Sequence, residues 1–418
     1  MAHLLTTKKV ECMEEKKEKK TPSIVKRVLI GLGLILLVGI GAFWGVFHNE
    51  IKTLASMEIL KPRNDEHQDG AVYTMHVSGD YYFDEFLEQG GVTDDAELVS
   101  FVTSHITHGL VEMKVDSPNI GCSSFTAQTQ EGDKVFGRNY DFSKTNTCLV
   151  FTDATEDRHA TISTIDFQFF DIDVNKDLST VMDYACALAA PYAPIDGIND
   201  AGVACGVYMT YQGEETVATD QNTSKPDLTS TTMLRAILDY ADNVDEAVEI
   251  AQSFDMHDSA NTSFHYMVAD ASGRSVILEW VGSEDGTDND GGARELRVTY
   301  NDDDAHIGQH EGETSYQVVT NFIIQPGYYD NAPVEEMKGL DRYEEIYARL
   351  DAVDGILPSE KDGVDILQAV GRRTWKNDDA NHTTVHSALY NMTDKTVTWV
   401  PNEHFDDPDS VYVFGFDD

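Results

Sequence analysis

The chain has 418 residues, of which 41% are hydrophobic, and it carries 74 Asp and Glu residues against 30 Lys and Arg residues. This length allows one large domain or two, and the hydrophobic fraction is sufficient for a core. The formal net charge of −44 would repel polyanions, which argues against a nucleic-acid partner. An acidic surface favours solubility and is also typical of adaptation to high salt, where screening tolerates dense carboxylates.

The amino-terminal 47 residues have the pattern of a membrane anchor. Residues 1–27 contain eight Lys or Arg residues and four Glu residues, and residues 28–47 contain no charged side chain. Twenty helical residues span roughly 30 Å, the thickness of the bilayer core. The positive-inside rule places the basic segment in the cytoplasm and the chain after about His48 outside. A cleaved signal peptide is the alternative, but its apolar part is shorter, about 7–15 residues.

Residues 48–121 are predicted to form a tether and then a folded pro-segment. The polar stretch 51–70 has the composition of a tether, and 71–77 alternates like a strand. Residues 81–88 and 95–108 have helical periodicity, with Asp94 or Asp95 as the cap of the second helix.

Neither the histidines of this region nor the cysteine content predicts a metal site or a disulfide framework. His105, His108 and Glu112 do not have the spacing of a known metal motif, so we expect no metal there. The five cysteines are too few for a disulfide framework, although one bridge remains open among Cys148, Cys186 and Cys205.

Residues 122–142 are predicted to form a β-hairpin. Residues 122–130 and 134–142 alternate like strands, and Glu-Gly-Asp at 131–133 supplies the turn. Antiparallel pairing brings Arg138 and Asp141 back beside Cys122. A thiol, a guanidinium and a carboxylate are therefore expected at one end of a sheet.

This combination suits a cysteine nucleophile. The reactive form is the thiolate, the pKa of a free thiol is about 8.5, and a nearby cation such as Arg138 stabilises the thiolate. The hairpin contains no His to serve as the base. An α-amino group, whose pKa is about 7.7–8.0, could serve if the Gly121–Cys122 bond were cleaved. Asp141 would then orient that amine.

The hairpin resembles the choloylglycine hydrolase family, in which Gly-Arg-Asn-x-Asp follows a cysteine at the start of a strand. Here Arg138 and Asp141 come sixteen and nineteen residues after Cys122. The family includes bile salt hydrolases and penicillin V acylases and belongs to the N-terminal-nucleophile hydrolases. The resemblance extends in pieces over most of residues 122–418, the predicted catalytic domain. It implies an α+β fold, a four-layer αββα sandwich, with Cys122 as nucleophile and base.

Later pieces of the resemblance supply further site residues. The Asp-Gly-Ile-Asn-Asp-Ala-Gly-Val run at 196–203 is similar to a family turn. Met209 falls at the later position where many family members have an Asn or Tyr that borders the oxyanion hole, and Tyr208 is one place earlier, so this chain departs from the family pattern there. Val-Val-Thr-Asn at 318–321 is similar to a family strand whose Asn donates to the oxyanion, which implies Asn321. Arg342 matches an arginine of the active-site hydrogen-bond network. The run 383–390 resembles a late core strand of the family.

The remaining elements are predicted from pattern alone. Residues 212–232 form a loop, two helices follow at 231–240 and 244–253, and a hairpin joins 264–269 to 275–281. The acidic run 284–290 has only a faint likeness to a calcium loop, and a solvated turn is the preferred interpretation.

Together these features predict an anchored, outward-facing enzyme that hydrolyses a linear carbon–nitrogen amide bond in a small N-acyl substrate. It would act through a Cys122 acyl-enzyme, after autocatalytic cleavage at Gly121–Cys122, without a metal or cofactor. Two alternatives stay open: a non-catalytic binding or sensor protein, and an acyltransferase that uses an amine acceptor. Bile salts, penicillin V, N-acyl homoserine lactones and N-acyl amino acids all fit the bond type. The pro-segment either stays bound after cleavage or is lost as the enzyme is shed.

Overall fold

The structure is a computed structural model and divides into two units, residues 1–48 and residues 49–418. It describes residues 43–107, 109, 121–170, 172–211, 221, 223–281, 294–302, 315–325, 328, 337–373 and 383–418. In the first unit the described residues, 43–48, are helical. Within the described part of the chain, no helix is both long and apolar enough to cross a membrane. Of the predicted anchor, residues 28–42 lie outside the described residues, so it remains a prediction.

The second unit contains a nine-stranded sheet. Its strand order is β1-β2-β5-β6-β7-β8-β11-β12-β13. The strands are β1 Glu58–Lys61, β2 Val72–Val77, β5 Thr147–Thr152, β6 Thr161–Asp166, β7 Asp196–Asn199, β8 Ala204–Met209, β11 Phe264–Ala269, β12 Ser275–Val281 and β13 Glu295–Tyr300. All neighbours are antiparallel except β2 and β5, which run parallel.

A seven-stranded sheet faces the first one. Its order is β14-β3-β4-β16-β17-β18, with β15 also paired to β3. The strands are β3 Gly121–Thr129, β4 Lys134–Phe142, β14 Val318–Val319, β15 Ile356–Leu357, β16 Thr383–Asn391, β17 Thr396–Pro401 and β18 Tyr412–Gly415. Side chains of the two sheets meet directly: Arg138, His386 and Tyr390 of the second sheet all contact Asp196 of the first.

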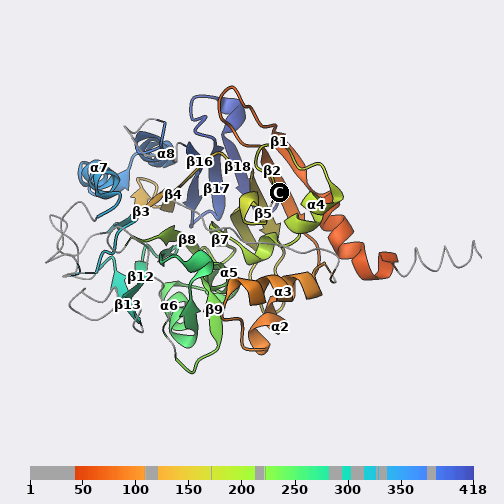
Figure 1. Cartoon of the computed structure of the whole chain (residues 1–418). Helices are drawn as coiled ribbons and strands as arrows, with labels where there is room; N and C mark the ends of the chain where they lie inside the picture. The colour runs from red at the N-terminus through yellow and green to blue at the C-terminus, as the bar shows by residue number, and fades with distance from the viewer. Residues whose placement is uncertain are drawn as a thin grey trace, which may run out of the picture. The chain divides into compact units, whose positions relative to one another are not determined.

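Helices cover the outer face of each sheet. α5 (Ser230–Tyr240) and α6 (Val244–Ser253) pack on the nine-stranded sheet, whereas α7 (Leu340–Asp351) and α8 (Glu360–Ala369) pack on the seven-stranded one. Figure 1 shows α7 and α8 beside β3 and β4, and α5 and α6 on the other side of the molecule. The central strands are therefore buried on both faces, which explains why β3 to β6 are almost continuously buried. The αββα layering agrees with the predicted α+β architecture.

The segment before Cys122 is part of this fold. β1 and β2 form one edge of the nine-stranded sheet, so residues 58–61 are a strand and not the polar tether that their composition predicts. α2 (Phe83–Glu88) and α3 (Asp95–His105) follow. The cap of α3 is Asp94, whose side chain accepts a hydrogen bond from the backbone N–H of Glu97. α3 ends at His105, three residues earlier than predicted.

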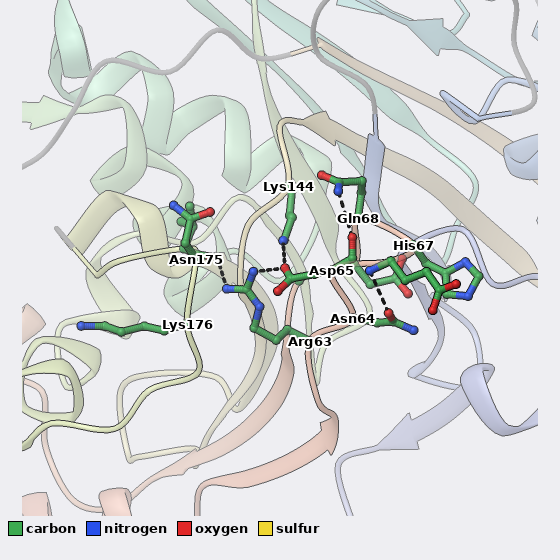
Figure 2. Close-up of polar contacts among 12 residues, drawn as sticks. Arg63, Asn64, Asp65, His67, Gln68, Lys144, Asn175 and Lys176 are labelled. Atoms are coloured by element: carbon green, nitrogen blue, oxygen red, sulfur yellow. Dashed lines mark hydrogen bonds and ion pairs between the residues drawn. The ribbon is translucent and has the colours of Figure 1, made fainter.

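Polar contacts also join the loop between β1 and β2 to later parts of the chain. In Figure 2, the Asp65 carboxylate contacts the ammonium of Lys144 and the guanidinium of Arg63. The second guanidinium nitrogen of Arg63 donates to the carbonyl of Val174 at 3.3 Å. These two cations lower the pKa of Asp65, Lys144 first. Ion pairs and hydrogen bonds thus fix the loop between β1 and β2 in addition to the pairing of these two strands.

The other predicted elements can be compared with the structure directly. The hairpin 122–142, the helices at 231–240 and 244–253, and the hairpin 264–281 are confirmed, each to within a residue or two. The predicted loop 212–232 contains a short strand, β9 (Asp227–Thr229), that pairs with β10 (Asp255–His257). The four described cysteines are all free thiols, so no bridge forms among Cys148, Cys186 and Cys205. The acidic run 284–290, His108 and Glu112 lie outside the described residues.

Candidate active site

Cys122 lies at the start of β3, at one end of the seven-stranded sheet. In the register of β3 and β4, Gly121 pairs with Asp141 and Cys122 pairs with Tyr140. The Cys122 side chain is completely buried. Two positions further on, Ser124 pairs with Arg138, so Cys122 and Arg138 share one face of the sheet.

Arg138 is the cation that lowers the pKa of the Cys122 thiol most strongly. Its own position is fixed by several contacts. Its Nε donates to Asp196 Oδ2 at 3.2 Å, and its Nη2 donates to the carbonyl of Val207 at 2.8 Å. The Tyr208 ring lies 4.2 Å from the guanidinium carbon. Nη1 is buried and has no hydrogen-bond partner among the described residues. This nitrogen is therefore available to an anion.

Burial and charge act in opposite directions on the thiol. Removal from water raises the pKa of Cys122, Arg138 and then Arg342 lower it, and Asp141 raises it; the net shift is upward. The resting side chain is therefore a neutral thiol near pH 7. A base must remove its proton before it can attack.

Asp141 lies on the opposite face of β4 from Arg138, because the two residues are three apart along a strand. Its Oδ1 accepts from the Thr384 hydroxyl at 2.7 Å. Its Oδ2 lies 3.2 Å from Arg342 Nη1 and 3.0 Å from Arg372 Nε. Arg342 Nη1 also donates to the Cys122 carbonyl, so it links the Asp141 carboxylate to the main chain of Cys122.

Asn321 and Arg342 hold the main chain of Cys122. The Cys122 N–H donates to Asn321 Oδ1 at 2.9 Å, and the Cys122 carbonyl accepts from Arg342 Nη1 at 2.6 Å. Arg342 Nη2 donates to the same Asn321 oxygen at 2.8 Å. Asn321 Nδ2 donates to the carbonyl of Met209 at 2.8 Å. One hydrogen of that amide nitrogen is left for a ligand, since a primary amide has two.

Tyr208 and Met209 lie close to this centre but differ in what they present. The Tyr208 hydroxyl donates to Ser124 Oγ at 2.6 Å, and its ring lies against Arg138. Burial raises the pKa of Tyr208. Met209 contributes its carbonyl to Asn321. The structure therefore brings all seven predicted site residues together, from β3, β4, β8, α7 and the segment after β14.

Sequence reasoning did not single out several buried polar residues that complete the network. Asp196 accepts hydrogen bonds from Arg138, His386, Tyr390 and Thr164. Although burial opposes its charged form, His386 and then Arg138 hold the pKa of Asp196 well below its usual range. The signal for Asp196 was its place at the start of the run 196–203, where it begins β7. Arg372 had no signal, because it is brought to Asp141 only by the tertiary fold.

Gly121 occupies a confined position next to Cys122. A Cβ at this residue would lie 2.2 Å from Arg372 Nη2 and 3.3 Å from the Cβ of Asp141. The Arg372 guanidinium is buried and paired with Asp141. A side chain at position 121 would therefore displace one of the cations around Asp141.

An apolar pocket is lined by residues that pair with or bind the predicted site residues. Three of its lining residues connect it to the site: Tyr140 pairs with Cys122, the Val207 carbonyl binds Arg138, and Phe264 pairs with Met209. Leu98, Val99 and Val102 of α3 form another part of the wall. The lining is predominantly apolar, as expected for a pocket that receives a hydrocarbon group.

Comparison with known proteins supports a definite classification. A family model described as acyl-coenzyme A:6-aminopenicillanic acid acyl-transferase matches residues 128–404. The matched segment begins after Cys122 and includes all the other predicted site residues. No curated protein matches the chain.

Solved structures with similar folds were also found. Penicillin V acylase from Agrobacterium tumefaciens is 17% identical, with 67% of this chain and 83% of that chain covered and a TM-score of 0.43. A mutant of conjugated bile acid hydrolase from Clostridium perfringens is 13% identical, with coverage of 71% and 92% and a TM-score of 0.47. The Caenorhabditis elegans ortholog of N-acylethanolamine-hydrolyzing acid amidase is 15% identical, with coverage of 65% and 93% and a TM-score of 0.38.

The two facing sheets with helices on their outer faces resemble the fold of the N-terminal-nucleophile hydrolases. The chain belongs to the acyl-coenzyme A:6-aminopenicillanic acid acyl-transferase family. The predicted resemblance to the choloylglycine hydrolase family is confirmed at the level of the wider N-terminal-nucleophile hydrolase group.

Proposed function

We propose that this protein cleaves itself at Gly121–Cys122 and then hydrolyses a linear amide bond in a small N-acyl substrate. The proposal rests on one hydrogen bond, which the Cys122 N–H donates to Asn321 Oδ1 at 2.9 Å. After cleavage this nitrogen becomes an α-amine, and Asn321 would already hold it beside the thiol.

The self-cleavage step uses groups already in place. The Cys122 sulfur adds to the Gly121 carbonyl and gives up its proton, and the peptide C–N bond breaks. The proton passes to the departing nitrogen, which becomes the α-amine, and Gly121 is left as a thioester on the Cys122 sulfur. Water then hydrolyses the thioester, which leaves a Gly121 carboxylate and the Cys122 thiol. The absence of a side chain at Gly121 leaves the attacked carbonyl open.

The α-amine then serves as the base of the amidase reaction. It takes the thiol proton, and the thiolate adds to the substrate carbonyl. The free amide hydrogen of Asn321 stabilises the oxyanion. The resulting ammonium protonates the leaving amine, and an acyl-enzyme remains. The amine next activates water, which attacks the thioester and releases the carboxylic acid.

The apolar pocket favours an acyl group of hydrocarbon character. A linear acyl chain would extend from the carbonyl at Cys122 past Tyr140 and Val207 toward α3. Because α3 belongs to the segment before Cys122, that segment would have to stay bound for the pocket to remain complete. This supports retention of the pro-segment over its loss.

The predicted membrane anchor completes the proposal. With residues 28–47 in the bilayer and a retained pro-segment, the catalytic domain, residues 122–418, would be held at the outer surface of the cell. Activity that stays with washed membranes after a high-salt rinse supports this arrangement, and activity found entirely in the medium contradicts it.

Two other functions are compatible with the same fold. The family description favours an acyltransferase, in which an amine in place of water attacks the acyl-enzyme. Product analysis with and without an added amine distinguishes the two, since a transferase yields a new amide. A binding protein would keep the pocket but leave the chain uncut.

The decisive experiment is intact mass measurement with N-terminal sequencing of the purified protein, beside Cys122→Ala. We expect a wild-type chain that begins at Cys122 and an uncut variant. Because the pKa of the Cys122 thiol is raised, processing should accelerate as the pH increases from 6 to 9. An uncut wild-type chain would contradict the mechanism and favour the binding protein.

A further inference from the structure

A second group of chemically distinctive side chains lies outside the catalytic centre, on the small parallel sheet formed by β9 and β10. In this sheet Asp255 pairs with Asp227, and His257 pairs with Thr229. Residues two apart on a strand point to the same face, and partners on neighbouring strands share that face. Asp227, Asp255 and His257 therefore project together, and their ligand atoms all lie within 4.8 Å of one another.

Asp255 is the feature that a purely structural interpretation does not explain. The residue is 1% exposed, and its Oδ1 has no hydrogen-bond partner within the described portion of the chain. Its other oxygen accepts from the backbone N–H of Thr223. A buried carboxylate oxygen without a partner costs free energy, and native proteins compensate such groups with a hydrogen bond, an ion or a water molecule.

The geometry around it is close to that of a metal site. His257 Nε2 and Asp227 Oδ1 are 2.8 Å apart. Ligands about 2.0–2.2 Å from a single Zn²⁺ ion are separated from each other by roughly 3 Å. One imidazole and two carboxylates suit a borderline divalent ion better than Ca²⁺ or Mg²⁺, which prefer oxygen alone.

We propose that Asp227, Asp255 and His257 bind a divalent transition-metal cation, with Zn²⁺ as the ion to be tested. Three protein ligands leave at least one coordination position for water. The ion supplies the missing partner of Asp255 Oδ1 and neutralises the two carboxylates.

The position of the site indicates a structural role. β9 leads directly into Ser230 and Thr231, and β10 leads into Ser259 and Ala260, all of which line the apolar pocket. The Asp227 N–H also donates to the Gly90 carbonyl at 2.8 Å, in the loop between α2 and α3. An ion that joins β9 to β10 therefore holds together two parts of the pocket wall and the loop that precedes α3.

The chain contains a matched control, a histidine with two carboxylates that cannot share an ion. His159 Nδ1 lies 2.7 Å from Asp200, and its Nε2 lies 3.0 Å from Asp242. The two carboxylates are on opposite sides of the ring. His159→Gln therefore removes a similar cluster without removing a convergent site.

The test is Zn²⁺ binding to the purified full-length protein, after treatment with a chelator, followed by calorimetry and thermal unfolding. We expect one saturable Zn²⁺ per chain and a rise in Tm of about 2 °C or more. Asp255→Asn and His257→Gln should each weaken binding on the order of 100-fold and remove the Tm rise, whereas His159→Gln should retain both.

Two outcomes would overturn the proposal. One is non-saturable binding of Zn²⁺, as expected if the acidic surface merely adsorbs the ion. The other is an undiminished single site in both Asp255→Asn and His257→Gln. If Asp255→Asn fails to fold, His257→Gln decides the question, because His257 is closer to the surface.

Discussion

Buried ionisable side chains determine the chemistry of this protein at the scale of single residues. Arg138 is completely buried and is paired with Asp196, which His386 also binds. Removing one member would leave an uncompensated buried charge, which typically costs about 3–5 kcal/mol. The pairing therefore fixes the guanidinium beside the thiol, whatever the pairs contribute to net stability.

Asp166 gives a pH-dependent test of this buried network. Burial raises the pKa of Asp166 to about 6, although hydrogen bonds from Thr145, Gln168 and Tyr140 oppose the shift. Between pH 3.8, the ordinary value, and about 6, the unfolded chain loses this proton while the folded protein keeps it. The free energy of unfolding therefore falls as the pH rises through this interval, and the effect levels off above it.

Asp166→Asn should abolish that fall. We expect the stability of the variant, relative to wild type, to increase on the order of 1–3 kcal/mol between pH 4 and pH 8. Urea unfolding at several pH values measures it. Glu403→Gln is the comparison. Burial raises the pKa of Glu403 to about 7, so the gain in stability of Glu403→Gln relative to wild type should continue up to about that pH. A stability difference for Asp166→Asn that does not change with pH would contradict the argument.

At the scale of elements, the hairpin of β3 and β4 and the helix α3 have different relations to the site. The hairpin is local: its turn and its alternation bring Cys122, Arg138 and Asp141 to the same end of a sheet. α3 is joined to the site only through long-range packing, and no pattern in residues 95–105 indicates that it borders a pocket.

The contribution of α3 can be tested by changing the size of one side chain. Val99 is half-buried and lines the pocket. Val99→Phe should lower kcat/KM for the longest accepted acyl chain by about 10-fold or more and leave the shortest within about 2-fold, because the added ring occupies the distal pocket. Rates on a series of N-acyl amides of increasing length provide the measurement.

Ser100→Phe is the control, since Ser100 is exposed on the same helix. It should leave the length preference of wild type unchanged. If Val99→Phe lowers the rates for all chain lengths equally, α3 does not set the acyl preference. Such a result would leave the Cys122 chemistry itself intact.

At the scale of the whole molecule, the segment before Cys122 is built into the fold. β1 and β2 form one edge of the larger sheet. Phe86 is completely buried, and its ring centroid lies 5.8 Å from that of Tyr192, which comes after Cys122 in the chain. The Tyr81 hydroxyl donates to both carboxylate oxygens of Asp239 at 2.8 Å. These contacts would outlast cleavage of the Gly121–Cys122 bond.

Phe86→Ala should weaken the hold on this segment after processing. Loss of a buried Phe costs about 3–5 kcal/mol, which corresponds to a fall of about 1 M or more in the urea concentration that separates the two pieces. Gel filtration of the cleaved protein at increasing urea concentrations measures it. Ile59→Ala, at a side chain that is 51% exposed, should behave like wild type. Separation of the wild-type pieces without urea would show that the segment is not retained.

The residues of the site could be predicted from the sequence to different extents. Cys122, Arg138 and Asp141 lie within twenty residues and are joined by a hairpin whose register follows from strand alternation. Asn321 and Arg342 lie 199 and 220 residues after Cys122, and only the resemblance to a family indicated them. Arg372 and Asp196 were missed, since nothing local shows which buried charges will meet.

The sequence by itself determined the hairpin and the main helices, because these follow from periodicity and turn chemistry. The αββα class followed only from the resemblance of local motifs to a known family. The tertiary structure alone decided which main-chain atoms of Cys122 are bound, which side chains contact Asp141, and that α3 borders the pocket. It also decided that Asp255 is buried beside Asp227 and His257. The physical reason is that strand pairing and burial depend on segments far apart in the chain, and alternation along one strand does not specify its neighbours.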